Sequence, residues 1–460
     1  MTGWTEAKQF VDSARANLDA VVAQFVEGND VFVARAPGRL DLMGGIADYS
    51  GSLVLQWPIQ EATWVGVQLS DAQDIRVVSL GAAANGRTPS FSLPLAAFAG
   101  RPDQDVYSVV RAEIAKTPQS EWAAYVVGAF AVLARERGVH FDRGARILIA
   151  SEVPEGKGVS SSAALEVATM QAVAGAYEIE LSSRDIGLLC QIVENRLAGA
   201  PCGVMDQLTA VCGKENSLLA ILCQPAEMLA NFGLPDGLSV WGVDSGVRHS
   251  VSGRDYGTVR TAAYMGLAMI TRSKQIDLGG YLARMSPSEF TQTYSSRLPE
   301  FVQGADFLAD LGQIADPLSI VLPERSYPVQ AATSHPIFEH FRVQTFFELL
   351  LEETTESRLR LLGELMYQSH NSYSACGLGS PATDLIVSMV RKAGYSRGLF
   401  GAKITGGGSG GTVAVLGRSD AEPVVREIAA QYAQQAGYTP YIFAGSSAGA
   451  ETFGVRRVKV

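Results

Sequence analysis

One stretch of the chain, residues 153–169, constrains the rest because it joins a segment that cannot be helical to one that favours a helix. Its first half, VPEGKGV, is rich in proline and glycine, and its second half, SSSAALEVAT, has three serines followed by helix formers. Leu165, Ala168, Ala172 and Val173 recur at helical spacing. The pattern predicts a glycine loop entering a helix through a serine N-cap, with backbone N–H groups converging at the positive end of the helix dipole. Such an arrangement binds anions, phosphate among them.

The loop does not match two familiar phosphate loops. Gly156 and Lys157 are followed by Gly158 where a Walker loop has Ser or Thr, and Ser161 stands where the dinucleotide fingerprint has glycine. An ordinary strand-to-helix turn with a good cap would explain a lone Gly-x-Gly. Two glycines followed by three serines and two alanines form a narrower pattern, which favours phosphate binding.

The composition limits the class of protein. The chain has 460 residues, 47% of them hydrophobic, so it can bury a large core and is expected to divide into at least two domains. A formal net charge of −10 without a Lys/Arg block argues against nucleic acid and anionic membranes as partners. Five cysteines without a C-x-x-C pair suit a reducing compartment. Residues 1–25 lack the pattern of a signal peptide, and the most apolar run, 122–134, is too short to span a bilayer. We therefore expect a cytoplasmic protein.

Strands and helices are predicted to alternate along the chain. Apolar runs bounded by turn residues predict strands at 31–34, 53–59, 63–69, 75–80, 146–150, 218–223, 238–243, 402–405, 412–416 and 438–443. Helical spacing predicts helices at 1–25, 183–197, 255–270, 346–367 and 420–435, and another that opens at 122. Residues 82–120 read as a long excursion. The order of elements near the C-terminus indicates an α+β sandwich with antiparallel pairs. A shift in composition divides the chain into domains of 1–248 and 249–460.

Several charged residues have two interpretations each. Arg39 and Asp48 lie in a glycine-containing segment between strands and would form a surface ion pair or hold a sugar or phosphate. Glu194, among apolar neighbours on a helix, is either a solvated edge residue or, with the Ser162 hydroxyl, a ligand of Mg²⁺. Asp206 opens a short helix after a Pro/Gly turn, where the helix dipole alone would favour it. The residues by themselves leave these alternatives open.

Two further features are also ambiguous. Trp122 and Tyr125, three residues apart at the opening of a helix, are either core residues or a wall against which a base stacks. The glycine-rich loop at 406–411 is either a flexible hairpin or a place where the backbone closely approaches a ligand.

Taken together, these segments resemble the GHMP small-molecule kinases and, within them, the galactokinase branch. The first family motif is similar to GRLDLMG at 38–44 with Asp48 and Tyr49, the second to PEGKGVSSSAALE at 154–166, and the third to residues 405–411. Glu194 and PCGVMDQ at 201–207 sit where galactokinases carry theirs. The resemblance implies a two-domain α+β fold, with an N-terminal mixed-sheet α/β domain (ribosomal S5 domain 2-like), a C-terminal ferredoxin-like domain and the active site between them.

The resemblance also implies an activity, which is ATP-dependent phosphorylation of a sugar at its anomeric hydroxyl with Mg²⁺ as the metal. Asp206 would be the catalytic base, and Arg39 would steady its charge and the moving phosphoryl group. The implied sets are the sugar-facing residues Gly45, Asp48, Gly203, Asp206 and Tyr256, the nucleotide-binding residues Trp122, Tyr125, Gly156, Lys157, Gly158, Val159, Ser160, Ser161 and Ser162, and the metal ligands Ser162 and Glu194. Phosphoryl transfer asks mainly for positioning and charge neutralisation, which these residue types supply. The expected protein is a monomer or a homodimer.

The departures from the galactokinase pattern point to the substrate. Galactokinases have an acidic residue and a histidine where this chain has Gly45 and Ile46, and in that family the acidic side chain reaches the outermost 6-hydroxyl of the sugar. Its loss predicts a sugar without a hydroxymethyl group, because an unpaired carboxylate would suffer a desolvation penalty. Galactose without carbon six is L-arabinose, and residues 43–56, 372–379 and 440–443 resemble the plant L-arabinokinases. Lys157 replaces a small residue of the usual loop and would add positive charge to the phosphate site.

Other functions fit parts of the pattern. A galactokinase is the first alternative to an L-arabinose 1-kinase. A catalytically silent sugar sensor is the second, but such relatives tend to be altered in the serine-alanine part of the second motif, which is intact here together with Glu194 and Asp206. A kinase for another alcohol, such as mevalonate or homoserine, is disfavoured by the galactokinase-like residues 48–49 and 202–206.

Overall fold

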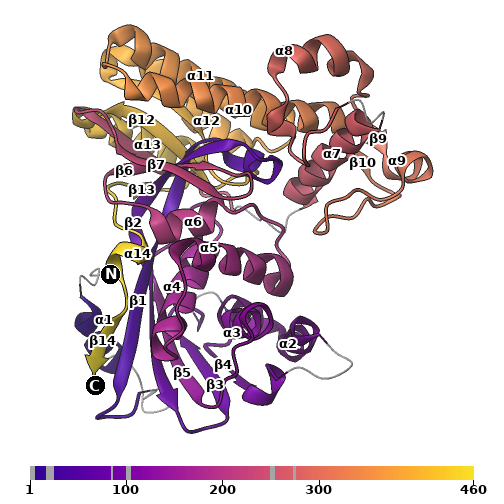
Figure 1. Ribbon diagram of the computed structural model, residues 1–460. Helices are drawn as coiled ribbons and strands as arrows, with labels where there is room; N and C mark the ends of the chain where they lie inside the picture. The colour runs from indigo at the N-terminus through magenta and orange to yellow at the C-terminus, as the bar shows by residue number, and fades with distance from the viewer. Residues whose placement is uncertain (1–5, 17–24, 84–85, 100–104, 249–253, 273–275) are drawn as a thin grey trace.

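The structure is a computed structural model that describes residues 6–16, 25–83, 86–99, 105–248, 254–272 and 276–460. Two β-sheets with helices packed on them lie one above the other in Figure 1, and the long strands β1 (Asp30–Met43) and β2 (Leu53–Ser70) run from the lower sheet toward the upper one. Helix α1 (Ala7–Ala16) and strand β14 (Arg456–Lys459) lie side by side at the lower sheet, where β14 pairs with β1. Both ends of the described chain therefore return to the same sheet.

The first sheet has the strand order β14-β1-β2-β5-β3-β4, with β6 paired to β2 and β7 paired to β6. Its remaining strands are β3 (Asp74–Ser79), β4 (Ser90–Pro94), β5 (Gly144–Ser151), β6 (Ser217–Leu222) and β7 (Glu227–Gly233). Strands β3 and β5 are parallel, and the other described pairs in this sheet are antiparallel. Strand β2 is long enough to pair with β6 at its start and with β5 at its end. It therefore connects the lower part of the molecule to the segments that form the site.

Both faces of the first sheet are buried, because apolar side chains occupy both alternating sets of positions along its strands. A strand sends successive side chains to opposite faces. Val31 and Val33 of β1 pack on the face that α1 covers, together with Leu148 and Ala150 of β5. The neighbouring positions pack on the opposite face; they are Ala34, Ala36, Ile147 and Ile149.

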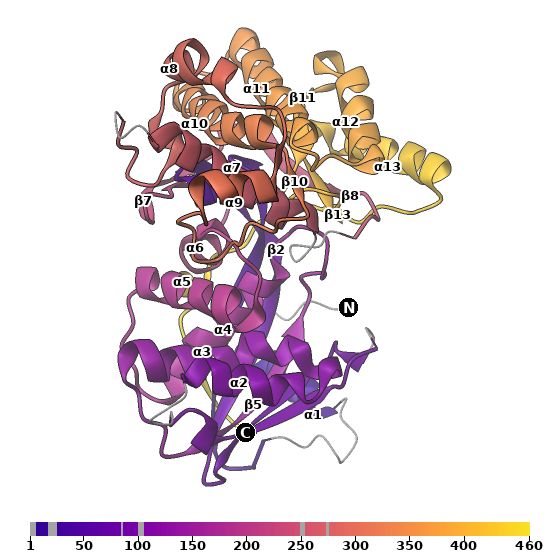
Figure 2. The same cartoon turned by 90° about the vertical axis from the view of Figure 1, so that its right-hand side faces the viewer.

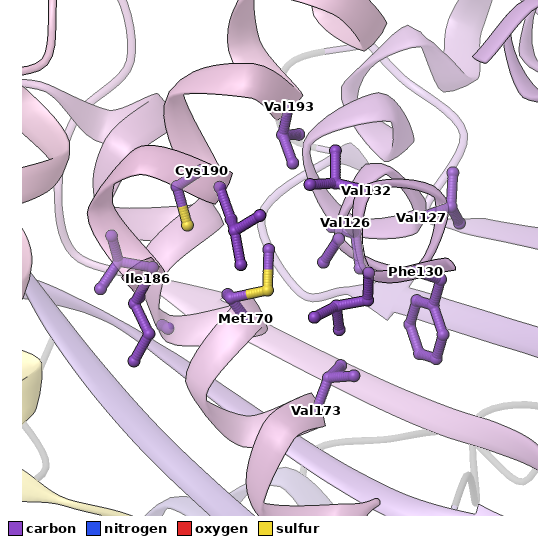
Figure 3. Packing of buried hydrophobic residues seen from close by; sticks show 14 of the residues in the cluster. Val126, Val127, Phe130, Val132, Met170, Val173, Ile186, Cys190 and Val193 are labelled. Carbon is purple, nitrogen blue, oxygen red and sulfur yellow. The ribbon is translucent and has the colours of Figure 1, made fainter. Parts of the chain in front are cut away.

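Helices cover this second face and hold the glycine-serine loop in place. They are α2 (Val106–Ala115), α3 (Ala124–Arg137), α4 (Ser161–Ala176) and α5 (Ser183–Ile192), which lie in front of the sheet in Figure 2. Figure 3 shows Phe130 of α3, Met170 of α4 and Cys190 of α5 meeting in one apolar cluster. Full burial of a Phe or Met side chain contributes about 1.5–3 kcal/mol. Since β5 enters the loop and α4 leaves it, the predicted strand-loop-helix order is confirmed.

The second sheet has the antiparallel order β11-β12-β8-β13. Its strands are β8 (Leu238–Asp244), β11 (Leu399–Ile404), β12 (Thr412–Arg418) and β13 (Ile442–Phe443). Helices α11 (Glu356–Ala375), α12 (Pro381–Ala393) and α13 (Glu422–Ala436) pack on it. Helices α7 (Arg254–Thr271) and α10 (Val329–Leu351) share an apolar cluster with the 3-10 helix η2 (Gly45–Ser50). The first family-like motif is thus held by elements from much later in the chain.

Some element predictions need correction. The segments 53–59 and 63–69 form the single strand β2, because the polar residues Gln60 and Glu61 between them stay extended instead of turning. Residues 82–120 contain β4 and α2 and are not an irregular excursion. The helix predicted at 183–197 changes into a π-helix over Val193–Ala198.

Other elements were not predicted from the sequence. They include β7, α9 (Gly304–Leu311), α12, β14 and the first half of α10. Of the helix predicted at 1–25, the structure describes α1, and residues 1–5 and 17–24 lie outside the described part.

The expected division between residues 248 and 249 does not follow the two sheets. Strand β8 lies before this point but belongs to the second sheet, where it pairs with β12 and β13. Strand β14 lies after it but belongs to the first sheet. The reason is that each sheet includes a strand from a remote part of the chain, which a change in composition does not reveal.

A buried ion pair joins the two parts of the molecule. The Lys403 Nζ atom of β11 lies 2.5 Å from the Asp41 Oδ2 atom of β1, and both side chains have no exposed surface. The other carboxylate oxygen accepts hydrogen bonds from Gln56 Nε2 (2.7 Å) and from the backbone N–H of Gly45 (2.9 Å). A buried charge is tolerated when it is paired and its remaining lone pairs are hydrogen-bonded. The pair therefore fixes β1 relative to the second sheet.

We predict that Lys403→Met lowers the free energy of unfolding by about 3–5 kcal/mol, since it leaves the Asp41 carboxylate buried without its cation. The double variant Asp41→Asn/Lys403→Met should recover part of this loss, because no buried charge remains. Urea-induced unfolding of the wild type, Lys403→Met and the double variant measures both effects. Arg397→Ala, which breaks the exposed pair with Glu427, is the control and should change stability by no more than about 1 kcal/mol. Equal effects of Lys403→Met and Arg397→Ala would contradict the prediction.

Candidate active site

A cavity of about 790 Å³ opens where the two parts of the molecule meet. Its wall combines the end of β1, helix η2, the glycine-serine loop, helix α6 (Met205–Cys212) and the glycine loop after β11. The predicted site residues that line it are Arg39, Asp48, Trp122, Tyr125, Gly156, Gly158, Ser160, Ser161, Ser162, Glu194, Gly203, Asp206 and Tyr256. Residues predicted from separate segments of the sequence therefore share one cavity.

The glycine-serine loop ends at the N-terminus of α4, as predicted, but not through a serine cap. Ser160 stands at the N-cap position with φ 60° and ψ 49°, a left-handed conformation, and its side chain makes no capping hydrogen bond. Its hydroxyl oxygen is instead buried without a hydrogen-bond partner in the structure. A buried hydroxyl without a partner is destabilising, and so is a left-handed residue other than glycine. Such features are typical of a loop shaped to contact a ligand.

Arg39 connects this loop to Asp206. Its Nε donates to the Asp206 Oδ1 atom at 2.8 Å, Nη2 lies 2.7 Å from the same oxygen, and Nη1 donates to the carbonyl oxygen of Gly158 at 2.7 Å. The Arg39 side chain is 3% exposed, whereas that of Asp206 is 20% exposed and lines the cavity. Asp206 lies in the first turn of α6. The ion pair foreseen as one interpretation of Arg39 thus involves Asp206 and not Asp48.

Glu194 lies in the π-helical turn that follows α5, and π-turns occur frequently at functional sites. Its carboxylate accepts hydrogen bonds from the Ser162 side chain and, at 2.6 Å, from Gln207 Nε2. Burial, together with the negative charge of Asp206, raises the pKa of Glu194 to about 7. Gln207 Nε2 also donates to Glu166 at 3.2 Å, and burial raises the pKa of that carboxyl far above its usual value. The Ser162 and Glu194 oxygen atoms are therefore adjacent to each other and surrounded by other carboxyl groups.

Asp48 and Gly203 meet on the opposite side of Asp206. A Cβ atom at position 203 would lie 1.9 Å from the Asp48 Oδ2 atom, so only glycine allows this approach. The Asp48 carboxyl accepts the backbone N–H of Tyr49 at 2.6 Å. Burial and the nearby charge of Asp206 raise the pKa of Asp48 to about 7. Asp48 can therefore accept or donate a hydrogen bond to a hydroxyl near neutral pH.

Aromatic rings complete this end of the cavity. Tyr256 packs edge-on against Tyr49, with the ring centroids 6.0 Å apart. Behind them, the Arg260 guanidinium lies 5.2 Å from the Tyr49 centroid and forms a buried pair with Asp316 at 2.9 Å. The sugar-facing residues implied by the resemblance are thus supported by helix α7 and by an ion pair that the sequence did not suggest.

The opposite end of the cavity is lined by Trp122 and Tyr125 at the start of α3. The Trp122 indole N–H donates to the carbonyl of Thr88 at 3.0 Å, and its side chain is mostly buried. Sequence reasoning missed Arg87 and Arg111, which line the same end; Arg87 pairs with Glu155 of the glycine-serine loop at 2.8 Å. No local motif marks these arginines, because their position depends on how residues 82–120 fold back over the loop.

Three predicted residues do not line the cavity: Gly45, Lys157 and Val159. The Lys157 Nζ atom lies 2.7 Å from Asp244 Oδ2 and 3.2 Å from the Tyr438 hydroxyl, which itself donates to Asp244. Its charge is therefore neutralised by the second sheet and does not add to the phosphate loop as the sequence suggested. Val159 is buried, and its carbonyl accepts the backbone N–H of Arg39 at 3.0 Å.

The glycine loop at 406–411 lies directly against the glycine-serine loop. A Cβ atom at Gly406 would be 2.8 Å from the carbonyl oxygen of Gly158, and one at Gly411 would be 2.8 Å from that of Lys157. Gly406 and Gly407 also line the cavity. The backbone thus closely approaches another loop of the chain, and its approach to a ligand stays a prediction. Arg248, which sequence reasoning did not single out as a site residue, also lines the cavity and lies beside Gly156.

Comparison with known proteins places the chain in a family. The N-terminal domain of GHMP kinases matches residues 124–214, the C-terminal domain matches residues 348–434, and the galactokinase galactose-binding signature matches residues 23–69. A galactokinase from Chloroflexus aggregans is 30% identical over 88% of this chain and 89% of its own length. The chain belongs to the galactokinase branch of the GHMP kinases. The predicted family and fold class are confirmed.

Two other proteins are similar to this member of the GHMP kinases. An L-arabinokinase from Arabidopsis thaliana is 43% identical over 94% of this chain, which spans about half (47%) of that relative's length. The crystal structure of Lactococcus lactis galactokinase complexed with galactose superimposes with a TM-score of 0.75 at 18% identity, covering 98% of this chain and 100% of that one. No helix among the described residues has the length and apolar character needed to cross a membrane.

We predict that Asp48→Asn flattens the pH dependence of this kinase's stability. A carboxyl whose pKa is higher in the folded chain takes up protons on folding, so its stabilising contribution is present below the unfolded value of 3.8 and lost as the pH rises through about 7. Each unit of pKa shift corresponds to about 1.4 kcal/mol. Urea unfolding at pH 4.5 and 7.5 should therefore show a smaller loss of stability in Asp48→Asn than in the wild type. Asp71→Asn, at a side chain 96% exposed, is the control and should retain the wild-type difference; an equal difference in Asp48→Asn would refute the prediction.

Proposed function

We propose that this protein is an ATP-dependent sugar 1-kinase that converts L-arabinose to L-arabinose 1-phosphate. The single observation that carries the proposal is the Arg39–Asp206 pair, which lies between the glycine-serine loop and the Asp48–Gly203 contact in one cavity. An aspartate held between a phosphate-type loop and a carboxyl suited to sugar hydroxyls fits transfer of a phosphoryl group to an alcohol. The L-arabinokinase and galactokinase relatives support this reaction class.

The residues present suit a nucleotide with Mg²⁺. The backbone of residues 156–161 and the positive end of α4 would hold the phosphates, and Trp122 and Tyr125 would flank the base. Ser162 and Glu194 would hold the metal. Among the described residues no group of three or more His, Cys, Asp or Glu side chains is arranged to bind a metal ion. Mg²⁺ usually binds one or two protein carboxylates and completes its coordination shell with water and phosphate oxygens. When bound, the ion would neutralise phosphate charge.

Asp206 would accept a proton from the attacking hydroxyl. One of its oxygens is held by two N–H groups of Arg39, which orients the carboxylate toward the cavity. The same guanidinium is fixed to the Gly158 carbonyl, so it lies beside the place where phosphoryl oxygens would pass. Positioning and charge neutralisation of this kind provide most of the catalysis in phosphoryl transfer. Arg39 would thus act on both the base and the transferred group.

The substrate is argued from the end of the cavity that η2 forms. Ile46 lines the cavity where a galactokinase would present a polar residue, and Gly45 contributes no side chain. An apolar wall leaves a sugar hydroxymethyl group without a hydrogen-bond partner, and a pocket of this kind disfavours one extra small group by about 10- to 100-fold. Asp48, Gly203 and Tyr256 would contact the remaining hydroxyls. We also propose a cytoplasmic location, since all five cysteines are unpaired, and a monomer or homodimer.

We predict that, with ATP and Mg²⁺, the purified protein phosphorylates L-arabinose with a higher kcat/KM than D-galactose. The expected ratio is about tenfold or more, the scale on which a pocket discriminates one small group. Sugar-dependent ADP release on a small panel of monosaccharides measures it. A preference for D-galactose would refute the substrate and leave a galactokinase, and sugar binding without any ADP release would leave a sensor.

We predict that Asp206→Asn lowers kcat for the preferred sugar by about 10²- to 10⁴-fold, the usual contribution of a general base. The KM for the sugar should change much less, because asparagine keeps the shape of the side chain. Steady-state kinetics measures both. The control is Asp420→Asn, at a side chain 73% exposed and remote from the cavity, which should leave kcat unchanged. A kcat within a few-fold of the wild type in Asp206→Asn would exclude the proposed role.

A further inference from the structure

Tyr373 fills the space into which a side chain at position 45 would project. A Cβ atom built on Gly45 would lie 1.5 Å from the Tyr373 hydroxyl oxygen and 2.8 Å from the Cζ atom of its ring. Gly45 also has a φ of +46°, which other residues rarely adopt. Position 45 is therefore kept without a side chain by a residue that lies more than three hundred positions later in the sequence.

The Tyr373 side chain cannot easily move aside. It projects from α11, has no exposed surface and packs with its ring centroid 5.3 Å from that of His335. On another side the Lys403 Nζ atom lies 5.2 Å from the ring centroid, and Lys403 is itself held by the buried pair with Asp41. A densely packed interior resists insertion of extra atoms. A larger residue at position 45 would have to displace this cluster.

The Tyr373 hydroxyl also fixes the wall of the cavity. It accepts the backbone N–H of Ile46 at 2.9 Å and donates to the carbonyl of Gly406 at 2.9 Å. These bonds join the first turn of η2 to the glycine loop after β11. Ile46 is 1% exposed and lines the cavity together with Asp48. The hydroxyl thus holds the apolar Ile46 side chain at the end of the cavity where the proposed sugar would bind.

The geometry points to Tyr373 as the positioning residue that sets the size of the accepted sugar. Tyr373 would act through η2, because its ring fills the space behind Gly45 and its hydroxyl binds the Ile46 N–H. These two contacts would keep the Ile46 side chain at the wall of the cavity. The site would then take a pyranose that carries only hydrogen at carbon five and exclude one with a methyl or hydroxymethyl group there. This inference rests on the proposed function and names the substrate class of the same site.

The experiment compares three sugars that differ only at carbon five of the pyranose ring. L-arabinose, D-fucose and D-galactose carry hydrogen, methyl and hydroxymethyl there, so they report on size and polarity separately. Steady-state kcat/KM with ATP is measured for wild type and for Tyr373→Leu. Because the leucine leaves room behind Gly45, η2 can retreat and Ile46 can recede. We expect the ratio of kcat/KM for D-fucose over L-arabinose to rise about tenfold or more, with a smaller rise for D-galactose.

A matched control separates this effect from a general loss of packing. Tyr367 lies on the same helix, is also buried and packs under the Arg391 guanidinium away from the cavity. Tyr367→Leu should lower the melting temperature without changing any ratio between sugars. Tyr373→Phe keeps the ring and removes only the hydroxyl, so it should move the D-fucose ratio in the same direction by a smaller factor. It also serves as the test if Tyr373→Leu does not fold.

The outcomes are distinct. If Tyr373→Leu folds and keeps the wild-type ratios of kcat/KM between sugars, the inference is overturned. If Tyr373→Leu does not fold, the same result in Tyr373→Phe overturns it. If Tyr367→Leu shifts the ratios equally, the effect is general loosening and the inference is also overturned. If the wild type prefers D-galactose, the proposed substrate fails. In that case the Tyr373 variants decide the positioning role separately. An unchanged ratio of kcat/KM for D-fucose over L-arabinose overturns the role, and a raised ratio supports it.

Discussion

The Arg39 guanidinium is the interaction on which the arrangement of the site depends. Its donors reach Asp206 on α6 and the Gly158 carbonyl in the glycine-serine loop, while its own backbone N–H binds the Val159 carbonyl. Because the side chain is almost fully buried, leaving any of these donors unpaired would cost free energy. The position of the loop and the orientation of Asp206 are therefore fixed by one group. Under the proposed function, this common anchor would keep the loop that holds the nucleotide at a fixed distance from Asp206, as phosphoryl transfer requires.

Strand β1 supports this arrangement because it carries Arg39 and Asp41 two residues apart. Between these residues β1 pairs with β2 in continuous register, so both side chains project from the same face. The register shifts on either side, between Pro37 and Arg39 and between Asp41 and Met43, and such irregularities occur often beside active sites. Arg39 lines the cavity, and Asp41, farther along the strand, reaches the buried Lys403 of the second sheet. One strand thus anchors the site and joins the two parts of the molecule.

The sequence predicted what local chemistry determines. The glycine-serine loop, the helix after it and Asp206 at the start of α6 all follow from neighbouring residues, and the structure places them as expected. The predictions about Ser160 and Lys157 were wrong. Ser160 adopts a left-handed conformation and makes no capping hydrogen bond, and Lys157 pairs with Asp244, a residue remote in the sequence.

Other contributors could not be predicted because their partners are remote. Tyr373, on α11, lies against Gly45, which is far away in the sequence. Arg87 likewise pairs with Glu155, which belongs to a distant segment of the chain. The absence of an acidic side chain at position 45 was visible in the sequence, whereas the residue that requires this absence was not. The electrostatics of the site show the same dependence on the whole fold. Burial and neighbouring negative charges raise the pKa values of Asp48, Glu166 and Glu194, and each of these carboxyls lies on a different element. These shifts cannot be inferred from the residue type or from its neighbours in the sequence, because they arise from groups that only the complete fold brings together.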